Sequence, residues 1–436
     1  MKININQGLK LPLRRLAEIL ALVATTAAST ATPAIEITSV PPYGSCDRLQ
    51  GRVTNADPAT HAVVVFIYIP CVYWWSKPVC NPALTPIRAD GTWSCSVATG
   101  GIDNLATNFC AMLVSTGYTG PCVLGLPALP PAVTSQAIAI QYVSREPVFP
   151  RRISFSGYEF HVKLSPCLTI GPGPCYYGDG TDQVWLDASN RLHLRISYSN
   201  SRWRSAEVIS MRRFGYGRYV IYLDTPIDAL DANAVWGCFT YGDMPCNTWR
   251  EIDFLEATRW GNPNDSNNCQ FVVQPWNVAG HRERFRVPPT VAKTTHVCVW
   301  DTDRVTFQTF AGHSTNDADL IREWTCTNAI PVPGDDTLRM NLYLADNKPP
   351  FNGQPVEVVI SRFEWRPLLK NWRYGEGTFE FTILGQAGQI YEVQTSDDLQ
   401  NWTTQDTVSA TSAAMLYRDT NAAARTKQFY RVLPVP

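Results

Sequence analysis

Three carboxylates stand close together in the segment EIDFLE, at Glu251, Asp253 and Glu256. Glu251 and Asp253 are two positions apart, so in a β-strand their side chains project from the same face. Glu256 would point to the opposite face of a regular strand. One extra residue at 254–255, a β-bulge, would return it to the face of the other two. With a bulge the segment predicts a row of three acids, and without one it predicts a pair and an isolated acid.

Two carboxylates that face one another across a groove are the reactive groups of most glycosidases. One protonates the leaving oxygen, and the other attacks the anomeric carbon or activates a water. A third acid between them can share a proton with the nucleophile and separate the pKa values of the pair. Exposed strands often alternate charged residues as well, so the acid row alone is moderate support for a catalytic site.

Aromatic residues surround the acid row. Tyr241, Trp249 and Trp260 lie within the same stretch, as do Trp236 and Phe239. Sugar rings have apolar C–H faces that stack on flat aromatic surfaces, so this group suits a carbohydrate groove. For Trp236 and Phe239 taken singly, core packing is the preferred interpretation.

The bulk composition predicts an all-β protein that binds no nucleic acid. The 37 basic residues almost balance the 38 acidic ones, which leaves no basic excess for a nucleic-acid surface. The chain has 32 Pro, 27 Gly and many β-branched and aromatic residues, as all-β folds with many turns do. Alternating runs such as 191–199, 217–224 and 356–365 predict strands.

Four segments are predicted along the chain. Residues 1–34 read as a secretory signal, basic and then apolar, with a short amphipathic helix as the alternative. A disulfide-rich β domain at 35–145, a central β domain at 150–368 and a small β domain at 371–436 follow. No later apolar run is long enough to span a bilayer. The sequence therefore predicts a secreted or cell-surface protein.

The 13 cysteines favour export. Six fall between 46 and 122 and seven between 167 and 326, which predicts three disulfides in each group with one thiol left over. The alternative is a set of buried free thiols. No pair has CxxC spacing, and no two histidines have metal-ligand spacing, so no metal site is predicted.

The acid segment resembles the catalytic strand of glycoside hydrolase family 16, in the ExDxxE form of its laminarinase-like members. Further blocks resemble the same family in the right order, so that the resemblance covers about 150–368. These blocks are 202–223, 235–241, 270–285, 295–312 and 356–365.

The resemblance implies a concanavalin A-like jelly-roll of two curved antiparallel sheets, with a cleft across one sheet. It implies retaining endo-hydrolysis of a β-glucan or galactan, with Glu251 as nucleophile, Glu256 as acid/base and Asp253 between them. No cofactor is expected, although many members carry a structural calcium ion whose ligands cannot be assigned here. A polysaccharide is the expected partner, and a monomer the expected state.

Eight residues are the candidates for substrate binding. They are Trp203, Glu207, Tyr241, Trp249, Arg259, Trp260, Trp276 and His281. For Glu207 a structural hydrogen-bonding role is an equal alternative. Arg259 and Trp260 replace the aromatic–Gly ending usual in the family, and they either line a subsite or pack a loop. A bridge between Cys238 and Cys246 is a further hypothesis, because it would clamp the loop beside the acids.

Two other readings of the chain remain. A lectin-like binder would keep the jelly-roll without catalysis, but loss of catalysis usually replaces one of the acids, and here all three are present. A structural surface protein would leave the acids beside tryptophans unexplained. In the first domain Trp74, Trp75 and Trp93 form either a sugar-stacking platform or core, and the last domain serves either attachment or stability.

Overall fold

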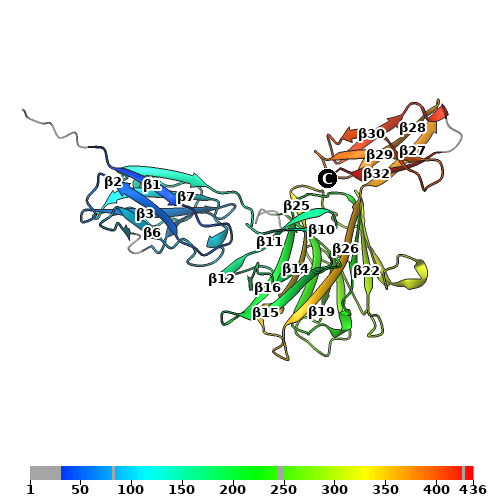
Figure 1. Cartoon of the computed structure of the whole chain (residues 1–436), viewed down its shortest axis with the longest axis horizontal. Helices are drawn as coiled ribbons and strands as arrows, with labels where there is room; N and C mark the ends of the chain where they lie inside the picture. Colours follow the sequence, from blue (N-terminus) through cyan, green and yellow to red (C-terminus); the bar gives the residue numbers. More distant parts are fainter. Residues whose placement is uncertain (1–30, 81–83, 243–249, 425–427, 436) are drawn as a thin grey trace, which may run out of the picture.

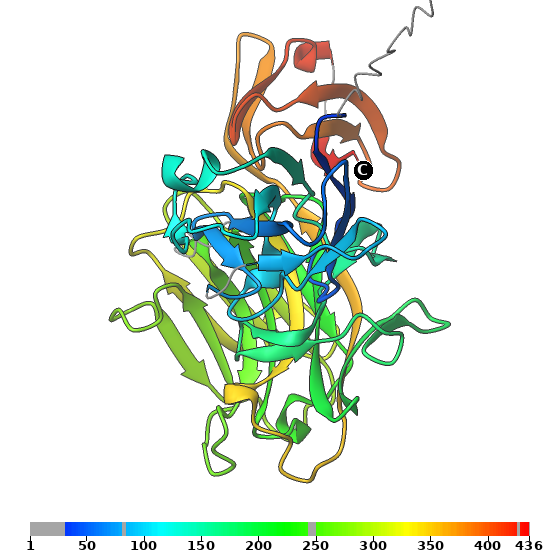
Figure 2. The ribbon, with the colours of Figure 1, turned by 90° about the vertical axis from the view of Figure 1, so that its left-hand side faces the viewer.

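The computed structural model describes residues 31–80, 84–242, 250–424 and 428–435 (Figure 1). Most of the predicted signal segment lies outside these residues. Within them the regular secondary structure is almost entirely β-strand, which confirms the predicted all-β class, and the one α-helix, α1, is Pro131–Thr134. No helix in the described part of the chain is long and apolar enough to cross a bilayer. The strands gather into three groups, with a smaller group against each of two ends of the large central one (Figures 1 and 2).

The first strand group consists of two antiparallel sheets that enclose an apolar core. One sheet has the order β1 (Ala34–Ser39), β2 (Leu49–Thr54), β6 (Thr92–Cys95). The other has the order β8 (Leu124–Leu126), β4 (Tyr73–Lys77), β3 (His61–Ile69), β7 (Asn108–Ser115), β9 (Ala139–Ser144), with β5 (Leu84–Pro86) paired to β3. Trp93 is buried in the core between them, Trp75 packs against that core, and Trp74 lies half-buried beside Tyr68 and Tyr142. Of the three predicted platform residues, Trp93 is therefore core.

The central group forms two antiparallel layers, as predicted for a β-sandwich. The layer named here the cleft sheet has the order β10 (Arg152–Phe155), β11 (Tyr158–Val162), β16 (Arg202–Ser210), β25 (Asp336–Leu344), β18 (Ala234–Gly242), β19 (Ile252–Thr258), β20 (Cys269–Val273), β21 (Arg282–Phe285). The layer named here the outer sheet has the order β14 (Val184–Leu186), β15 (Leu192–Ser199), β26 (Val356–Arg366), β17 (Gly217–Leu223), β22 (Thr294–Trp300), β23 (Val305–Ala311), β24 (Leu320–Cys326).

Short elements complete this group and the loops. A hairpin of β12 (Ser165–Ile170) and β13 (Cys175–Tyr177) joins β16 beside the first strand group. The described 3₁₀ turns are η1 (Asp103–Leu105), η2 (Ile227–Ala229), η4 (Asp317–Asp319), η5 (Ala345–Asn347) and η6 (Ala422–Ala424).

Alternation along each strand builds the core between the two layers. On β25 the residues Leu338, Met340 and Leu342 are buried in this core, and the residues between them face the other way. Aromatic residues of both layers meet there: the ring centroids of Phe254 on β19 and Tyr219 on β17 are 4.6 Å apart. Period-two patterning therefore fixes which side chains remain for the outer face of the cleft sheet.

The last strand group continues this core without a break. It comprises β27 (Leu368–Gly375), β28 (Thr378–Leu384) and β31 (Ala414–Asp419) in one sheet, and β30 (Thr403–Ser409), β29 (Ile390–Ser396) and β32 (Phe429–Pro434) in another. Tyr391 belongs to the same apolar cluster as Trp365 of β26, with ring centroids 6.3 Å apart. The predicted boundaries of all three domains stay predictions.

The cysteines differ from the predicted pattern. Among the described residues, Cys80 pairs with Cys122 inside the first strand group, and Cys46 pairs with Cys167 across to β12. The buried free thiols are Cys95, Cys110, Cys175, Cys238, Cys269, Cys298 and Cys326. The prediction of three disulfides in each group is therefore wrong, because most of these cysteines occupy apolar core positions. The Cys238–Cys246 hypothesis is also wrong, because Cys238 points into the core; Cys246 itself lies outside the described residues.

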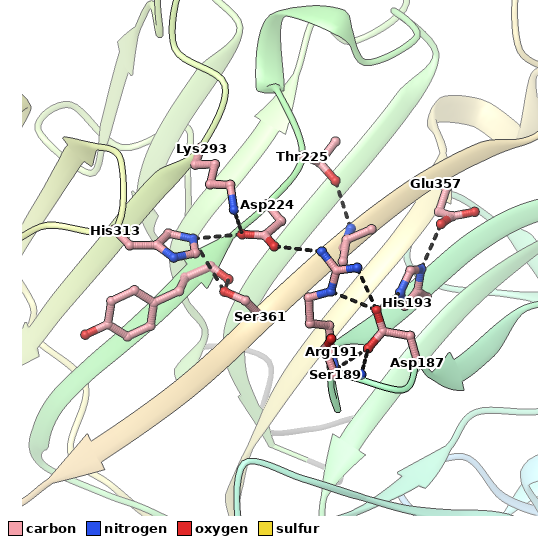
Figure 3. Close-up of polar contacts among 12 residues, drawn as sticks. Asp187, Ser189, Arg191, His193, Asp224, Thr225, Lys293, His313, Glu357 and Ser361 are labelled. Carbon is pink, nitrogen blue, oxygen red and sulfur yellow. Dashed lines mark hydrogen bonds and ion pairs between the residues drawn. The ribbon is translucent and has the colours of Figure 1, made fainter.

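Acidic residues of the outer sheet and its loops are bound to cations (Figure 3). Asp224, after β17, lies 3.1 Å from Arg191, 3.2 Å from Lys293 and 2.9 Å from His313. Asp187 lies 2.7 Å from Arg191. Burial opposes ionisation of Asp224, but hydrogen bonds from Arg191 and Lys293 outweigh it and lower its pKa. Hydrogen bonds from the backbone and side chain of Arg191 lower the pKa of Asp187.

Candidate active site

The acid row begins directly before β19, with Glu251. The backbone carbonyl of Glu251 accepts a hydrogen bond from the Gln274 N–H at 3.0 Å, which continues the ladder to the next strand. On the side of β18, Leu255 pairs with Cys238 and Asp253 pairs with Phe239, so Phe254 is an extra residue. The pairing with β20 shifts at the same place. The conditional β-bulge at 254–255 is thus present.

The bulge sends two successive side chains into the core. Phe254 and Leu255 both belong to the apolar cluster between the layers and are fully buried. Asp253 before them and Glu256 after them line one cavity together with Glu251. Of the two predicted outcomes, the structure shows the row of three acids on one surface.

The cavity has a volume of about 600 Å³ and extends across the cleft sheet away from β19. From β18 it is lined by Gly237, Phe239 and Tyr241. From β25 it is lined by Thr337, Arg339, Asn341 and Tyr343, the residues that alternate with the buried Leu338, Met340 and Leu342. A mixed polar and aromatic lining of this kind suits a ligand with both hydroxyl groups and apolar faces.

Burial raises the pKa of all three acids, and repulsion between the acids adds to the rise at Glu251 and Asp253. Burial raises the pKa of Glu251 to about 8 together with the charge of Glu256, while a hydrogen bond to Asp253 and the charge of Arg339 act against the rise. Burial, followed by the charges of Glu251 and Glu256, raises the pKa of Asp253 well above its usual value. Burial also raises the pKa of Glu256, against a hydrogen bond from Gln270. The row therefore holds protons that isolated carboxylates would have lost at neutral pH.

Two amides from the neighbouring strand and its loop orient the acids. The Gln270 side-chain amide donates to Glu256 at 2.6 Å, and that of Gln274 donates to Asp253 at 3.1 Å. The Gln270 oxygen accepts from Arg284 at 3.1 Å, which turns its NH₂ group toward the acid. Sequence reasoning missed both glutamines. They stand four positions apart in QFVVQ with Phe271 and Val273 buried between them, so strand alternation was the available signal.

Glu207 lines the same cavity but is paired with cations. Its carboxylate lies 2.8 Å from Lys163 and 3.1 Å from Arg339, and its side chain is fully buried. Lys163 also donates to the carbonyl of Gly171 at 2.7 Å, and its ammonium lies 4.3 Å from the centroid of the Tyr177 ring. These contacts hold Glu207 in the charge-paired arrangement expected of a buried carboxylate.

Asn341 is a second polar residue that sequence reasoning missed. It is 1% exposed, lines the cavity, and has no hydrogen-bond partner for either side-chain polar atom among the described residues. It pairs across the sheet with Gly237, which is itself opposite Glu256. A Cβ on Gly237 would lie 2.9 Å from the Asn341 oxygen, so glycine leaves room for this amide beside the acid. An unsatisfied buried amide in a cavity is suited to bind a ligand hydroxyl group.

Three of the predicted binding residues lie near the acids. Tyr241 lines the cavity beneath the Arg339 guanidinium, which is 4.8 Å from its ring centroid. Trp260 is 41% exposed, and its indole N–H lies 3.5 Å from the Gln270 oxygen, at the Glu256 end of the row. Trp276 is 54% exposed, and its backbone N–H donates to Gln274 at 2.9 Å.

Three other predicted residues, like Trp260 and Trp276, are not among those that line the cavity. Arg259 forms an ion pair with Asp228 at 2.6 Å, which corresponds to the loop-packing alternative. Trp203 is half-buried with its ring 5.4 Å from that of Tyr198. His281 is buried, and its ring nitrogens have no hydrogen-bond partner within the described ranges. Trp249 lies outside the described residues. Their binding roles stay predictions.

The structural calcium ion implied by the resemblance stays a prediction. Among the described residues no group of three or more His, Cys, Asp or Glu side chains is arranged to hold a metal ion.

Comparisons with known proteins return structural likenesses only. No protein-family model matches the chain, and no curated protein matches it. A Bacillus licheniformis β-glucanase is 20% identical, with a TM-score of 0.35, over 47% of this chain and 90% of its own. A lichenase from a mouse hindgut metagenome is 18% identical, with a TM-score of 0.34, over 49% of this chain and 97% of its own. A Mycobacterium tuberculosis protein described as a pseudo β-1,3-glucanase is 18% identical, with a TM-score of 0.36, over 47% of this chain and 90% of its own.

Proposed function

We propose that the protein is a retaining glycosidase that cleaves a β-glucan or galactan polysaccharide. The observation that carries this proposal is the bulged strand, which presents Glu251, Asp253 and Glu256 to one cavity. Retaining glycosidases need a nucleophile and an acid/base close to one another on the same side of a groove. Both glutamates line the same cavity, and the charge of Glu256 affects the pKa of Glu251.

In the first step Glu256 donates its proton to the glycosidic oxygen while the Glu251 carboxylate attacks the anomeric carbon. The glycosidic bond breaks, the leaving sugar takes the proton, and a covalent glycosyl ester forms on Glu251. In the second step Glu256 takes a proton from water, and the resulting hydroxide displaces Glu251 from the sugar. Burial of Glu256 favours the protonated form that the first step requires.

Asp253 takes part in proton sharing within the row. Burial and the charges of Glu251 and Glu256 raise its pKa well above the usual value, so we expect Asp253 to carry the proton of its hydrogen bond to Glu251. This hydrogen bond and the positive charge of Arg339 favour the ionised Glu251 that acts as nucleophile. Three acids in one cavity titrate as a set, so the pH profile will report apparent pKa values of the set.

A second candidate function is sugar binding without cleavage. The observation that favours it is the pKa of Glu251, which is raised to about 8, because a protonated carboxyl cannot attack an anomeric carbon at neutral pH. Trp260, Trp276 and the unpaired amide of Asn341 would serve a sugar-binding surface as well as an active site.

Export is part of the proposal. The basic and apolar start of the sequence supports it, as do two disulfides in the described residues, since such bonds persist in oxidising compartments. Amino-terminal sequencing of protein recovered from the culture medium of an expressing bacterium tests it: a new start near residue 34 is expected, and an intact Met1 in the cytosol contradicts it.

The deciding experiment is a reducing-sugar assay on laminarin, lichenan, agarose and carrageenan. The wild-type protein should hydrolyse one of them, and Glu251→Gln should abolish hydrolysis. Glu357→Gln is the matched control, because this outer-sheet carboxylate contacts His193 and Arg195 outside the cavity. Proton NMR of the first product should show retention of the anomeric configuration. Binding to a polysaccharide column without any cleavage would support the second candidate instead.

A further inference from the structure

The first strand group contributes to the cavity that holds the acids. Tyr43, Ile102, Leu105 and Phe149 line the same cavity as Glu251 and Glu256. Between β19, which carries the acids, and β11, which lies beside these residues, the sheet order passes through β18, β25 and β16. Four strand spacings of about 4.8 Å place the two ends of the cavity roughly 19 Å apart. The cavity thus runs across the strands from the acid row to the first strand group.

At this end of the cavity, a disulfide and hydrogen bonds attach the first strand group to the central group. The disulfide between Cys46 and Cys167 joins the segment after β1 to β12. The buried Asn104 amide donates to the Gly44 carbonyl at 2.9 Å and to the Ser165 hydroxyl at 3.0 Å, so one side chain binds both groups. At Gly44, with φ of +83°, a Cβ would lie 2.3 Å from the Leu164 carbonyl oxygen. The close approach of the two backbones at Gly44 requires glycine.

The two ends of the cavity region differ in character. At the first strand group the lining is apolar. Tyr43 packs against Phe149, from the segment after β9, with ring centroids 5.0 Å apart; Ile102 precedes η1, and Leu105 is its last residue. At the other end, Trp260 is exposed beside Gln270, near Glu256, and Trp276 is exposed after β20, next to Gln274; neither lines the cavity itself. A glycan placed across the acids therefore meets, in one direction, the apolar surface of the first strand group, which is fixed to the central group. In the other direction it meets exposed tryptophan rings.

We propose that the first strand group is the end wall of the substrate cleft and limits how many sugar units bind between it and the acids. The proposal rests on the proposed function and deepens it: cleavage falls at a fixed distance from one chain end, which departs from the endo-hydrolysis that the family resemblance implies. The terminal sugar places an apolar ring face on Ile102 and Leu105, which line the cavity. The rest of the polysaccharide extends out of the cavity on the side of the acids, where Trp276 is exposed.

The test compares products from length-defined oligosaccharides. Laminarin- and lichenan-derived oligosaccharides labelled at the reducing end are digested briefly with the full chain, and the products are sized by mass. For the wild type, one of the two product fragments should have the same length whatever the substrate length. Leu105→Ala and Ile102→Ala enlarge the closed end, so this fragment should become longer and more variable. Ile102→Trp fills the closed end and should shorten the fragment.

Leu124→Ala is the matched control, because Leu124 belongs to the same strand group but is 59% exposed and outside the cavity. It should leave the product pattern unchanged. Thermal unfolding of each variant distinguishes a changed wall from a lost fold, and the opposite shifts expected for Ile102→Ala and Ile102→Trp cannot arise from destabilisation alone. The proposed end wall would be contradicted if the wild type hydrolysed the oligosaccharides and both product fragments occurred in every length. Absence of any hydrolysis would instead count against the proposed function.

Discussion

The acids of the cleft sheet and those of the outer sheet have opposite environments within one sandwich. On the outer sheet Asp224 and Asp187 face Arg191, and their pKa values are lowered (Figure 3). On the cleft sheet Glu251 and Asp253 face each other and Glu256, and their pKa values are raised. A carboxylate bound to a cation stabilises the folded state at neutral pH, whereas a cluster of buried acids destabilises it. The difference indicates that the cleft acids serve reactivity rather than stability.

Glu207 is the exception on the cleft sheet. It lines the cavity with the acid row, yet it is bound by Lys163 and Arg339 as firmly as the acids of the outer sheet are bound by their cations. One cavity therefore combines a neutralised acid, in a supporting position, with three acids that share protons. Glu207 thus holds Arg339 in position, whereas the three acids of the row are the groups proposed to react.

The largest expected effect is on turnover. Glu256→Gln should lower kcat by about 100- to 10,000-fold, because it removes the proposed proton donor and leaves the bulge and the apolar core unchanged. Initial-rate measurements on the hydrolysed polysaccharide test this. Asp224→Asn, on the outer sheet, should leave kcat unchanged; a comparable loss in both variants would show that the two sheets do not differ in this way.

The next largest effect is on stability. Lys163→Met leaves the buried Glu207 carboxylate without its closest cation and should lower the free energy of unfolding by about 3–5 kcal/mol. Lys293→Met removes a cation that is half exposed beside Asp224 and should cost about 1 kcal/mol or less. Urea unfolding of both variants provides the measurement. Equal losses would contradict the contrast between a buried and an exposed ion pair.

The smallest expected effect is in the pH dependence of stability. Because the pKa of Asp253 is raised on folding, the folded state binds more protons than the unfolded state between the usual pKa and the raised one. Stability therefore falls as pH rises through that range. Asp253→Asn removes this titration and should raise stability at neutral pH more than in acid, where the carboxyl is protonated in both the folded and the unfolded state.

Asp224→Asn provides the mirror image for that measurement. The lowered pKa of Asp224 contributes stability above the unfolded pKa, and this contribution is lost as pH falls. The variant should therefore lose stability at neutral pH and differ least from the wild type in acid. Unfolding midpoints measured from acid to neutral pH would reveal both trends, and parallel curves for the two variants would refute the opposite signs.

Strand alternation carried much of the prediction from sequence. The acid row needed only the spacing of Glu251, Asp253 and Glu256 and one conditional bulge, because Phe254 and Leu255 are both apolar and must both reach the core. The same reasoning applied to β25 and β20 would have found Asn341, Gln270 and Gln274.

Other features depend on contacts between segments far apart in the sequence. The pairing of Cys46 with Cys167, over 121 positions, depends on how the first strand group packs beside β12. Likewise Ile102 and Leu105 carry no local sign that they lie in the same cavity as acids that follow them by about 150 residues. Composition suggested cysteines for disulfides, whereas burial made most of them core residues.

The bulge at Phe254 and Leu255 makes this strand tolerant of one particular change in length. Deletion of either residue would restore a regular two-residue repeat, in which Asp253 and Glu256 are two positions apart and still face the cavity. The deletion would remove one apolar side chain from the core and bring the carboxyl of Glu256 closer to Asp253. Natural or engineered variants of this segment can accordingly lose one of these two residues and keep all three acids on one surface.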